Sequence, residues 1–574
     1  MCTTKVEGLE LQIQENYAQW CKQACEDKDI AAELAAVKNQ PEEITDRFYR
    51  DLAFGTGGLR GVIGAGTNRM NIYTVRRATR GLALWLTKQK KNPSAAISYD
   101  SRIKSRLFAE EAARTFAACG VTAYLYPQLM PTPALSFAVR SLHCSAGVMV
   151  TASHNPAKYN GYKAYGPDGC QITTKAAEEI TACIESVGYF DALPENSGAK
   201  VETVPANVAE DFYQAVLAQR LEKEVPAQLK IVYTPLNGTG LVPVTTVLKR
   251  AGYTDITVVP AQEKPDGNFP TCPFPNPEIP EALAEGIKLC RQCNAELLLA
   301  TDPDCDRMGI AVHVGDDYKL LSGNEVGALL LDYVCRRRIA RGTLPKNPVA
   351  VKTIVTTELA AKIAAHYGVE LRNVLTGFKF IGEQIGFLEK DGQVSRYIFG
   401  FEESYGYLSG SHVRDKDAVN ACLLLCDMAA DYKAQGKSLY DAVEALYQQY
   451  GYYKNGLDSF AFEGESGFHI MQDLMTYLRN NPLTELCGHK VTLVKDYLHT
   501  PGKPVQFPSL PSSDVLQYVM DDDTCLTVRP SGTEPKVKLY CAAVGKTEEA
   551  ADAACAEYRK AVSAIINDFG KGRN

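Results

Sequence analysis

The 574-residue sequence has no long hydrophobic run and no excess of basic charge. Its longest apolar stretches are short, such as ACLLLC at 421–426, whereas a membrane-spanning helix needs about 20 apolar residues. Lys and Arg number 61 against 68 Asp and Glu, which gives a net charge of -7. We therefore expect no membrane insertion and no general affinity for nucleic acid, so any anion site must be built locally.

A secretory signal and a zinc-type cysteine pattern are also missing. The first residues, MCTTKVEGLELQIQ, lack the charged and apolar regions of a signal peptide. The 18 cysteines are scattered, and the one CxxC pair, Cys290 and Cys293, has no second pair at zinc-site spacing. We expect these two cysteines to be ordinary helix residues and the chain to be cytoplasmic.

Hydrophobic periodicity predicts an α/β protein. Short β-rich runs alternate with helical patterns, and in three successive stretches a strand runs directly into a polar loop. The three pairs are SAGVMV before TASHNP, AELLLAT before DPDCDR, and RYIFG before FEESYG. This repeat of layout predicts three similar α/β domains with mixed sheets, followed by a smaller C-terminal α+β domain.

The predicted domains have approximate boundaries. Domain I carries the TASHNP loop, domain II the DPDCDR loop, domain III the FEES loop and domain IV a C-terminal SGTEP turn. Because ligand groups gather beyond the carboxyl ends of strands in open α/β sheets, we expect an active site in the central cleft. The ranges are 1–205, 206–325, 326–455 and 456–574.

The DPDCDR loop has the strongest signal for a metal. Asp302, Asp304 and Asp306 alternate along the loop, and three carboxylates so close together need a cation, most simply Mg²⁺. A calcium EF-hand would need Gly and Glu where this chain has Arg307 and His313. The alternative is an acidic turn exposed to solvent.

The TASHNP loop offers a hydroxyl at Ser153 beside His154, which suits a nucleophile or a phosphate carrier. It does not match the G-x-S-x-G elbow, and a simple turn is the alternative. Lys163, in the following GYKAYGPDG, fits either a cation beside a phosphate or an exposed hairpin.

The RPSGTEPK segment has the chemistry of a phosphate monoester site, although a hairpin turn would also account for it. Nucleotide motifs fail elsewhere: FGTGGLRG has Arg60 at the third glycine position, and Gly436-Lys437-Ser438 lacks the first glycine of a Walker A loop. The candidate phosphate-binding residues are Arg529, Ser531, Gly532 and Thr533.

TASHNP, DPDCDR, GFEES and RPSGTEPK occur in this order, one in each predicted domain, and the chain thereby resembles the α-D-phosphohexomutase superfamily. The resemblance spans nearly the whole chain and is strongest to the long bacterial-type phosphoglucomutases, a branch that includes phosphoglucomutase/phosphopentomutases. Further agreeing motifs are FGTGGLRG, YDSR, NGYKAYGPDG, PDGNFP and TGFK.

The resemblance implies an activity and roles for residues. It implies that Ser153 is phosphorylated and that one Mg²⁺ per chain is held by that group with Asp302, Asp304 and Asp306. Arg60 and Lys163 would supply positive charge, with Arg307 a weaker candidate. Glu402 and Ser404, with Thr376 and Gly377, would bind the sugar, and the RPSGTEPK residues would hold the phosphate that is not transferred. The candidates for the general acid/base are Lys379, His412 and His154.

The implied reaction interconverts glucose 1-phosphate and glucose 6-phosphate, with glucose 1,6-bisphosphate as intermediate and activator. Alternatives on the same scaffold are a phosphopentomutase, a phosphomannomutase or a glucose 1,6-bisphosphate synthase. Two others are a phosphohydrolase and a non-catalytic phosphosugar-binding regulator. The expected partners are small-molecule sugar phosphates, with no nucleic acid, membrane or partner protein. Cys305 stands where alanine is common, so we expect an oxidation-sensitive loop if its thiol is exposed.

Overall fold

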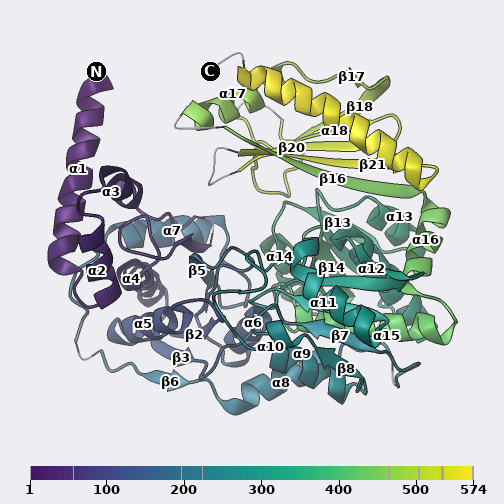
Figure 1. Cartoon of the computed structure of the whole chain (residues 1–574), viewed down its shortest axis with the longest axis horizontal. Helices are drawn as coiled ribbons and strands as arrows, with labels where there is room; N and C mark the ends of the chain where they lie inside the picture. The colour runs from purple at the N-terminus through teal and green to yellow at the C-terminus, as the bar shows by residue number, and fades with distance from the viewer. Residues whose placement is uncertain are drawn as a thin grey trace. The chain divides into compact units, whose positions relative to one another are not determined.

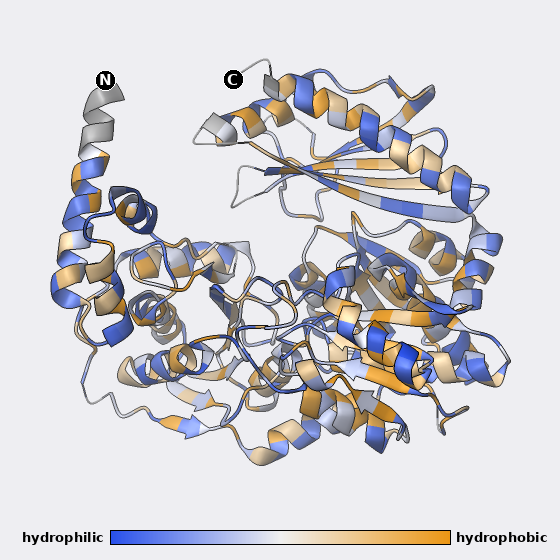
Figure 2. Ribbon diagram, in the orientation of Figure 1, coloured by the Kyte–Doolittle hydropathy of each residue, from blue (hydrophilic) through white to orange (hydrophobic). Residues whose placement is uncertain are grey.

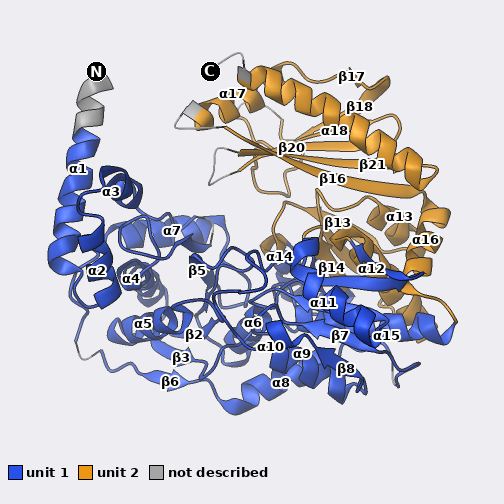
Figure 3. Ribbon diagram, viewed as in Figure 1, with its two compact units in different colours: residues 1–321, 381–397, 405–435 blue, residues 322–380, 398–404, 436–574 orange. Residues whose placement is uncertain are grey.

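The computed structural model describes residues 2–55, 57–195, 197–222, 224–462, 466–501, 504–531 and 536–571. The chain divides into two compact units (Figure 3). Unit 1 contains residues 1–321, 381–397 and 405–435, and unit 2 contains residues 322–380, 398–404 and 436–574. Among the described residues, no helix is both long and apolar enough to cross a bilayer.

The first sheet of unit 1 is mixed, with the strand order β1-β5-β4-β2-β3-β6 (Figure 1). Strands β4, β2, β3 and β6 are parallel, whereas β5 runs antiparallel to both β1 and β4. Helices α5 and α6 pack on β2 and β4, and α4 packs on α5 and α7. The strands are β1 (Gly58–Val62), β2 (Ser94–Tyr99), β3 (Thr122–Leu125), β4 (Ala146–Val150), β5 (Tyr159–Tyr165) and β6 (Val201–Thr203). The helices are α4 (Ile72–Gln89), α5 (Ser105–Ala118), α6 (Thr132–Ser141) and α7 (Thr174–Glu185).

Three N-terminal helices, which the sequence analysis did not predict, precede this sheet: α1 (Cys2–Gln23), α2 (Lys28–Ala36) and α3 (Pro41–Phe48). They join the first domain through Trp20, which is 1% exposed. Its ring meets Phe48, Tyr73 and Phe190 edge-on, at centroid distances of 5.8, 5.5 and 5.4 Å. An aromatic cluster of this kind buries a large apolar area, so these helices belong to the core of unit 1.

The second sheet of unit 1 has the order β11-β10-β9-β7-β8. Its central strand β9 is buried along its whole length, as expected for LLLAT, and runs directly into the acidic loop. Helix α11 contains Cys290 and Cys293, which confirms that they are helix residues. The strands are β7 (Ile231–Thr234), β8 (Ile256–Val258), β9 (Leu297–Thr301), β10 (Met308–Val314) and β11 (Asp317–Leu321). The helices are α8 (Ala206–Leu217), α9 (Leu241–Arg250), α10 (Pro260–Glu263), α11 (Pro280–Cys293) and α15 (Ala418–Ala434), and β15 (Gly406–Leu408) also lies in unit 1.

Unit 2 carries the third α/β layer, in which β12 lies between β13 and β14 and is parallel to β13. The strands are β12 (Val349–Thr353), β13 (Glu370–Val374) and β14 (Tyr397–Glu402), and β14 begins at the boundary between the units. The helices of unit 2 are α12 (Gly323–Ala340), α13 (Leu359–Tyr367) and α16 (Leu439–Tyr450). Before β14 the chain forms α14 (Phe378–Lys390), which lies mostly in unit 1, and the short η1 (Val394–Arg396), which lies in unit 1.

The C-terminal part of unit 2 is an antiparallel sheet with the order β16-β21-β20-β19-β18-β17. Residues alternate between buried and partly exposed along β21, and helices α17 and α18 pack against this strand. Figure 2 shows the hydropathy of both units residue by residue. Together with the three α/β layers, this sheet confirms the predicted fold class. Its elements are β16 (Tyr452–Ala461), α17 (Ser466–Asn480), β17 (Glu485–Leu486), β18 (His489–Asp496), β19 (Leu516–Met520), β20 (Cys525–Pro530), β21 (Lys536–Gly545) and α18 (Glu548–Lys571).

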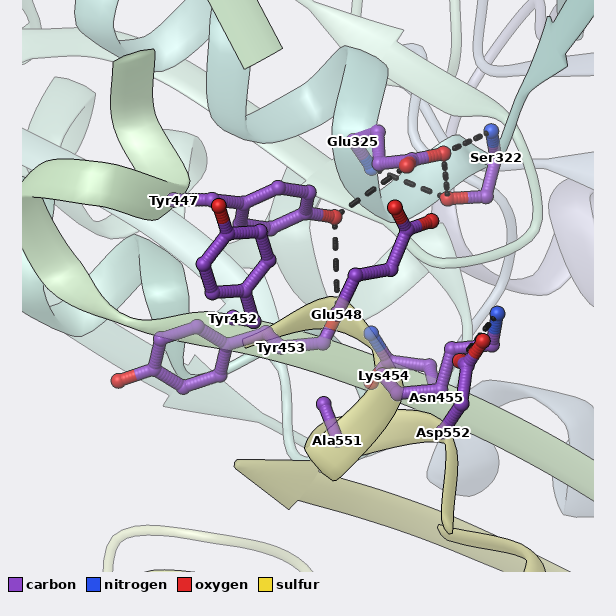
Figure 4. Close-up of a pocket in the computed structure, with 10 residues that line it drawn as sticks. All are labelled: Ser322, Glu325, Tyr447, Tyr452, Tyr453, Lys454, Asn455, Glu548, Ala551 and Asp552. Atoms are coloured by element: carbon purple, nitrogen blue, oxygen red, sulfur yellow. Dashed lines mark hydrogen bonds and ion pairs between the residues drawn. The ribbon is translucent and has the colours of Figure 1, made fainter. Parts of the chain in front are cut away.

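Polar contacts join the third layer to the C-terminal sheet where α16 leads into β16 (Figure 4). The Tyr447 hydroxyl donates to the Glu325 carboxylate at 3.2 Å, and its ring stacks on Tyr452 at 5.2 Å. Lys454 forms an ion pair of 2.7 Å with Asp552 at the start of α18. Glu325 also completes the capping box of α12 with Ser322, so one carboxylate serves two contacts.

A buried ion pair stabilises the part of unit 1 around the second sheet, and its contribution can be measured. Asp427 of α15 is fully buried and accepts from Arg220 at 2.8 Å and from the Tyr253 hydroxyl at 2.8 Å. Asp427→Ala leaves both donors without their acceptor, so we expect it to cost about 3 kcal/mol of stability. Because both tryptophans, Trp20 and Trp85, lie in unit 1, tryptophan fluorescence during urea unfolding reports this loss.

The control is Glu210→Ala, which removes an exposed ion pair with Arg250 in the same unit. We expect little change in its urea midpoint, because exposed pairs contribute little. Equal midpoints for the two variants would contradict the importance of the buried pair.

Candidate active site

The serine loop follows β4 and holds its backbone in an unusual conformation. Ser153 has φ of +53°, a left-handed value that is uncommon for a residue other than glycine. Its N–H donates to Thr151 Oγ1 at 2.8 Å, and Thr151 Oγ1 donates to Asp100 at 2.6 Å. Ser153 is only 3% exposed, so its hydroxyl faces a formed interior and not open solvent.

Arg102 clamps this loop. Its guanidinium donates to the carbonyl of Ser153 at 2.5 Å and to those of Pro156 and Tyr159 at 3.0 and 3.1 Å, with a further bond to that of Asn155. The fork geometry of arginine suits several acceptors at once. The sequence analysis noted the YDSR motif that contains Arg102 but gave it no role.

The acidic loop follows β9, and its three carboxylates converge as predicted. Asp302, Asp304 and Asp306 are 0, 0 and 1% exposed, and one ligand atom from each lies within 4.8 Å of the others. Asp302 Oδ1 accepts from the N–H groups of Asp306 and Arg307 at 3.1 and 3.0 Å. Their burial rules out an acidic turn exposed to solvent.

The structure brings the serine, the acids and a lysine together within unit 1. Ser153 Oγ donates to Asp302 Oδ2 at 2.9 Å. Lys163 Nζ lies 2.7 Å from Asp304 Oδ2 and 3.2 Å from Asp306 Oδ2. Lys163 is on β5, an interior strand between β1 and β4, so the exposed-hairpin interpretation of GYKAYGPDG is wrong.

Two further residues support the acids, and the sequence analysis missed both. Lys416, in the RDKD segment, lies 3.3 Å from Asp306 Oδ2. Thr132, at the start of α6, donates through its hydroxyl to Asp304 Oδ2 at 2.7 Å and through its N–H to the Asp304 carbonyl at 2.9 Å. The only sequence signal for either was a position beside a Pro-rich or charged motif.

The acids keep donor atoms for a metal. Asp304 Oδ1 and Asp306 Oδ1 are buried, and neither has a hydrogen-bond partner among the described residues. Buried carboxylate oxygens are costly without a partner, and hard oxygen donors are those that Mg²⁺ prefers. The residues present therefore fit a magnesium ion.

The pKa values follow from burial and charge. Burial, reinforced by the charges of Asp304 and Asp306, raises the pKa of Asp302 well above its usual value. Burial also acts to raise the pKa of Asp304, but Lys163 outweighs it and holds this pKa far below its usual value. Burial acts to lower the pKa of Lys163, but Asp304 and Asp306 raise it overall, so the lysine stays charged.

His154 and Arg60 lie beside the serine loop. His154 Nδ1 is 3.3 Å from Ser153 Oγ, and burial with the positive charges of Arg307 and Arg60 lowers the pKa of this histidine well below its usual value. Its ring is therefore neutral. Arg60, on β1, donates to Asn155 Oδ1 at 3.4 Å, and Arg307 forms an ion pair with Glu278 at 2.5 Å.

The predicted sugar-binding residues lie in unit 2. Glu402 ends β14 and is 4% exposed, and Ser404 follows it in the loop. Thr376 and Gly377 lie just before α14, where Gly377 has φ of +120°, which glycine adopts easily. Lys379, in the first turn of α14, lies over the Phe380 ring at 5.2 Å.

The predicted phosphate loop is described in part. Arg529 lies on β20 opposite Lys538, and the Ser531 N–H donates to the Lys536 carbonyl at 2.7 Å, whereas Gly532 and Thr533 lie outside the described residues. Tyr540, which was not predicted from the sequence, is close enough to Arg529, Glu402 and Glu403 for their charges to act on its hydroxyl. Burial and the charges of Glu403 and Glu402 raise its pKa to about 12, although Arg529 opposes them.

His412 and Cys305 have contacts that bear on their predicted roles. His412 Nε2 lies 2.8 Å from Asp417, whose carboxylate caps α15. Cys305 is fully buried, and burial raises the pKa of its thiol well above the usual value. A buried neutral thiol is a poor target for oxidants, so the exposure on which the oxidation hypothesis depended is absent.

Comparisons with known proteins agree with this geometry. Family models described as phosphoglucomutase/phosphomannomutase alpha/beta/alpha domains I, II and III match residues 51–189, 209–315 and 322–450. A phosphoglucomutase of Staphylococcus aureus (strain bovine RF122 / ET3-1) is 39% identical over 511 residues, covering 87% of this chain and 90% of that protein.

Two solved structures share the fold. A putative phosphomannomutase from Thermus thermophilus has a TM-score of 0.68 at 23% identity, over 90% of this chain and 99% of its own. The phosphoprotein pp63/parafusin from Paramecium has a TM-score of 0.64 at 17% identity, over 92% and 96%. The family models and the bacterial relative establish that the chain belongs to the phosphoglucomutase/phosphomannomutase family of the α-D-phosphohexomutase superfamily.

Proposed function

We propose that the protein is a phosphoglucomutase that interconverts glucose 1-phosphate and glucose 6-phosphate through a phosphorylated Ser153. One observation carries the proposal: the Ser153 hydroxyl lies 2.9 Å from a carboxylate of a buried acidic triad that Lys163 also contacts. A hydroxyl beside a site for a divalent cation and a fixed lysine suits phosphoryl transfer, which depends on positioning and charge neutralisation.

Ser153 is the carrier in this proposal. The bond between phosphorus and Ser153 Oγ breaks as a bond forms to the free hydroxyl of the sugar phosphate, whose proton passes to the general base. The product of this step is glucose 1,6-bisphosphate. After the bisphosphate reorients in the site, its other phosphoryl group passes to Ser153 Oγ, the sugar oxygen that it leaves takes the proton back from the general acid, and the product sugar monophosphate leaves.

Charge neutralisation falls to the residues around the serine. Asp302, Asp304, Asp306 and the phosphoserine would hold Mg²⁺, which when bound supplies positive charge beside the transferring phosphoryl group. Lys163 adds a fixed cation, and its contacts with Asp304 and Asp306 orient it. We assign Arg60, beside Asn155 of the serine loop, to the same role.

The general acid/base is one of three residues. His154 is neutral and contacts Ser153 Oγ, which suits a proton acceptor near the carrier. Lys379 and His412 are the other candidates. The contact of His412 with the carboxylate that caps α15 gives that histidine a structural role as well.

The candidate residues of unit 2 would recognise the rest of the substrate. We propose that Glu402, Ser404, Thr376 and Gly377 bind sugar hydroxyls. Arg529, Ser531, Gly532 and Thr533 would hold the phosphate that is not transferred. The position of Tyr540 near both Arg529 and Glu402 supports a shared task for these two groups. We keep the division into the four predicted domains, each with one such task.

The sugar preference separates the main alternatives. A relative in the fold comparison is a putative phosphomannomutase, and the branch that the sequence resembles includes phosphopentomutases. We propose glucose phosphates as substrates, glucose 1,6-bisphosphate as activator and a cytoplasmic location, which the free thiols of the described cysteines support.

The first prediction concerns the carrier. In a Mg²⁺-dependent assay with trace glucose 1,6-bisphosphate, we expect glucose 1-phosphate to react faster than mannose 1-phosphate or ribose 1-phosphate. Ser153→Ala should lower kcat at least about a thousandfold, as loss of a nucleophile does. The control is Ser186→Ala at the end of α7. Faster turnover of ribose 1-phosphate would show that the proposed substrate is wrong. Binding of sugar phosphates without turnover would favour the non-catalytic regulator.

The second prediction concerns the metal. We expect chelation to abolish turnover, and Mg²⁺ to raise the unfolding temperature of the wild-type protein. Asp306→Asn should bind Mg²⁺ at least about tenfold more weakly in a calorimetric titration, since even partners outside a ligand set change metal affinity by that much. Asp317→Asn, which alters an exposed acid on β11, is the control. Equal affinities in the two variants would contradict the ligand set.

The third prediction concerns the phosphate loop. Arg529→Gln removes a guanidinium that would pair with the phosphate, so we expect kcat/KM for glucose 1-phosphate to fall about 10- to 100-fold. The change should lie mainly in KM, because this phosphate is not the one transferred. Arg372→Gln, which changes a half-buried arginine of β13 that pairs with Glu370, is the control. A fall in kcat alone would place Arg529 in the transfer step.

A further inference from the structure

Unit 1 contains a cavity of about 540 Å³ that none of the proposed phosphoryl-transfer residues lines. Three segments form its walls: residues 99–102 at the end of β2, residues 127–130 after β3, and residues 238–243 at the start of α9. Arg106 and Pro265 complete the lining. Its volume lies within the range of sites for small organic molecules.

Most of the wall is apolar, but two hydroxyls in it lack partners. Leu129, Met130 and Val242 supply apolar surface. Thr239 is 2% exposed, and its Oγ1 has no hydrogen-bond partner among the described residues; the same holds for the buried Oγ of Ser101. Both oxygens are also closed off from the cavity, so a ligand there would gain from the apolar wall and not from these hydroxyls.

The charges of the lining favour an acid. Asp100 and Arg102 face each other at 3.3 Å and are committed to the serine loop. The remaining charge is Arg106, whose side chain is 71% exposed and pairs with Glu110 at 2.8 Å. An anionic head group at this rim would share the Arg106 cation with Glu110, and the apolar body would fill the cavity.

We propose that this cavity binds a small, mostly apolar organic acid and thereby regulates the phosphoryl-transfer site.

Each wall segment of the cavity is linked, by hydrogen bonds of its own or of a residue close to it in sequence, to the serine loop or the acidic loop. Arg102 holds the Ser153 carbonyl at 2.5 Å, and the Thr239 N–H donates to the Pro303 carbonyl of the acidic loop at 2.8 Å. Two residues after Met130, the Thr132 hydroxyl donates to Asp304. A ligand that shifts any wall changes the serine loop or the acidic loop. The regulation rests on the proposed function, whereas the binding does not.

The test uses two fluorescent probes with the same ring system. The anion 8-anilinonaphthalene-1-sulfonate (ANS) matches the proposed ligand, and N-phenyl-1-naphthylamine lacks the sulfonate. We expect saturable binding of one ANS per chain. Val242→Asp, at a 55% exposed position on the cavity wall, should weaken ANS binding at least about tenfold through like charge. Val505→Asp, at a 40% exposed position in unit 2, is the matched control and should change it less than about twofold.

Arg106→Ala tests whether the cavity prefers an anionic ligand. We expect it to weaken binding of the anionic probe about threefold or more and to leave the neutral probe unchanged within about twofold. Equal effects on both probes would overturn the assignment of an acid. Unchanged ANS affinity in Val242→Asp, or competitive displacement of ANS by glucose 1,6-bisphosphate, would overturn the cavity as the site.

The regulatory step has its own readout. ANS at its wild-type Kd should change kcat of the wild-type protein in the mutase assay and have a several-fold smaller effect on Val242→Asp. An unchanged kcat with cavity binding intact would overturn the regulation alone. If the wild-type protein has no mutase activity, the proposed function fails, and the titrations still decide whether the cavity binds the acid.

Discussion

Three buried carboxylates within one loop are the constraint on which the rest of unit 1 depends. Asp302, Asp304 and Asp306 would repel one another strongly in a medium of low polarity, so the fold must supply compensating groups. It does so from three separate places in the sequence: Lys163 on β5, Lys416 after β15 and Thr132 at the start of α6. Two carboxylate oxygens remain without a hydrogen-bond partner among the described residues. A metal ion bound to them would supply the positive charge that the buried loop still needs.

The sheet topology explains how distant segments meet this demand. The serine loop and the acidic loop each begin where a buried strand ends, β4 in one sheet and β9 in the other. The antiparallel strand β5 places Lys163 opposite Met149 of β4, one residue before that strand ends. The lysine therefore reaches the acids because one strand of a mainly parallel sheet is reversed. The mixed sheet thus serves the chemistry directly.

Functional residues could be predicted from the sequence where they lie together in one short segment. The triad, the serine and the strands before them were predictable, because three alternate acids directly after an apolar strand need a cation to lie together. Arg102, Thr132, Lys416 and Tyr540 were not assigned, since each acts through partners far away in the chain, which no local pattern reveals. The burial of Cys305 and the interior position of β5 also depend on tertiary packing. The N-terminal helices were missed because the apolar residues of α1 are weakly periodic and find their core only by packing against distant parts of the chain. The buried residues of the three helices are Ile13, Trp20, Ile30, Leu34, Ile44 and Phe48.

Backbone strain gives an independent argument that the two loops act together. Ser153 and Cys305 have φ of +53° and +52°, one in each loop. Such conformations cost about 1 kcal/mol or more for residues other than glycine and persist only where surrounding contacts impose them. Hydrogen bonds with Arg102 and Thr151 impose the conformation of Ser153. The hydrogen bonds that Asp302 accepts from the next N–H groups of its loop impose that of Cys305. The two strained turns bring Ser153 Oγ to Asp302 across 149 residues of sequence. In the proposed function this contact serves phosphoryl transfer, which would account for a strained conformation being kept in both loops.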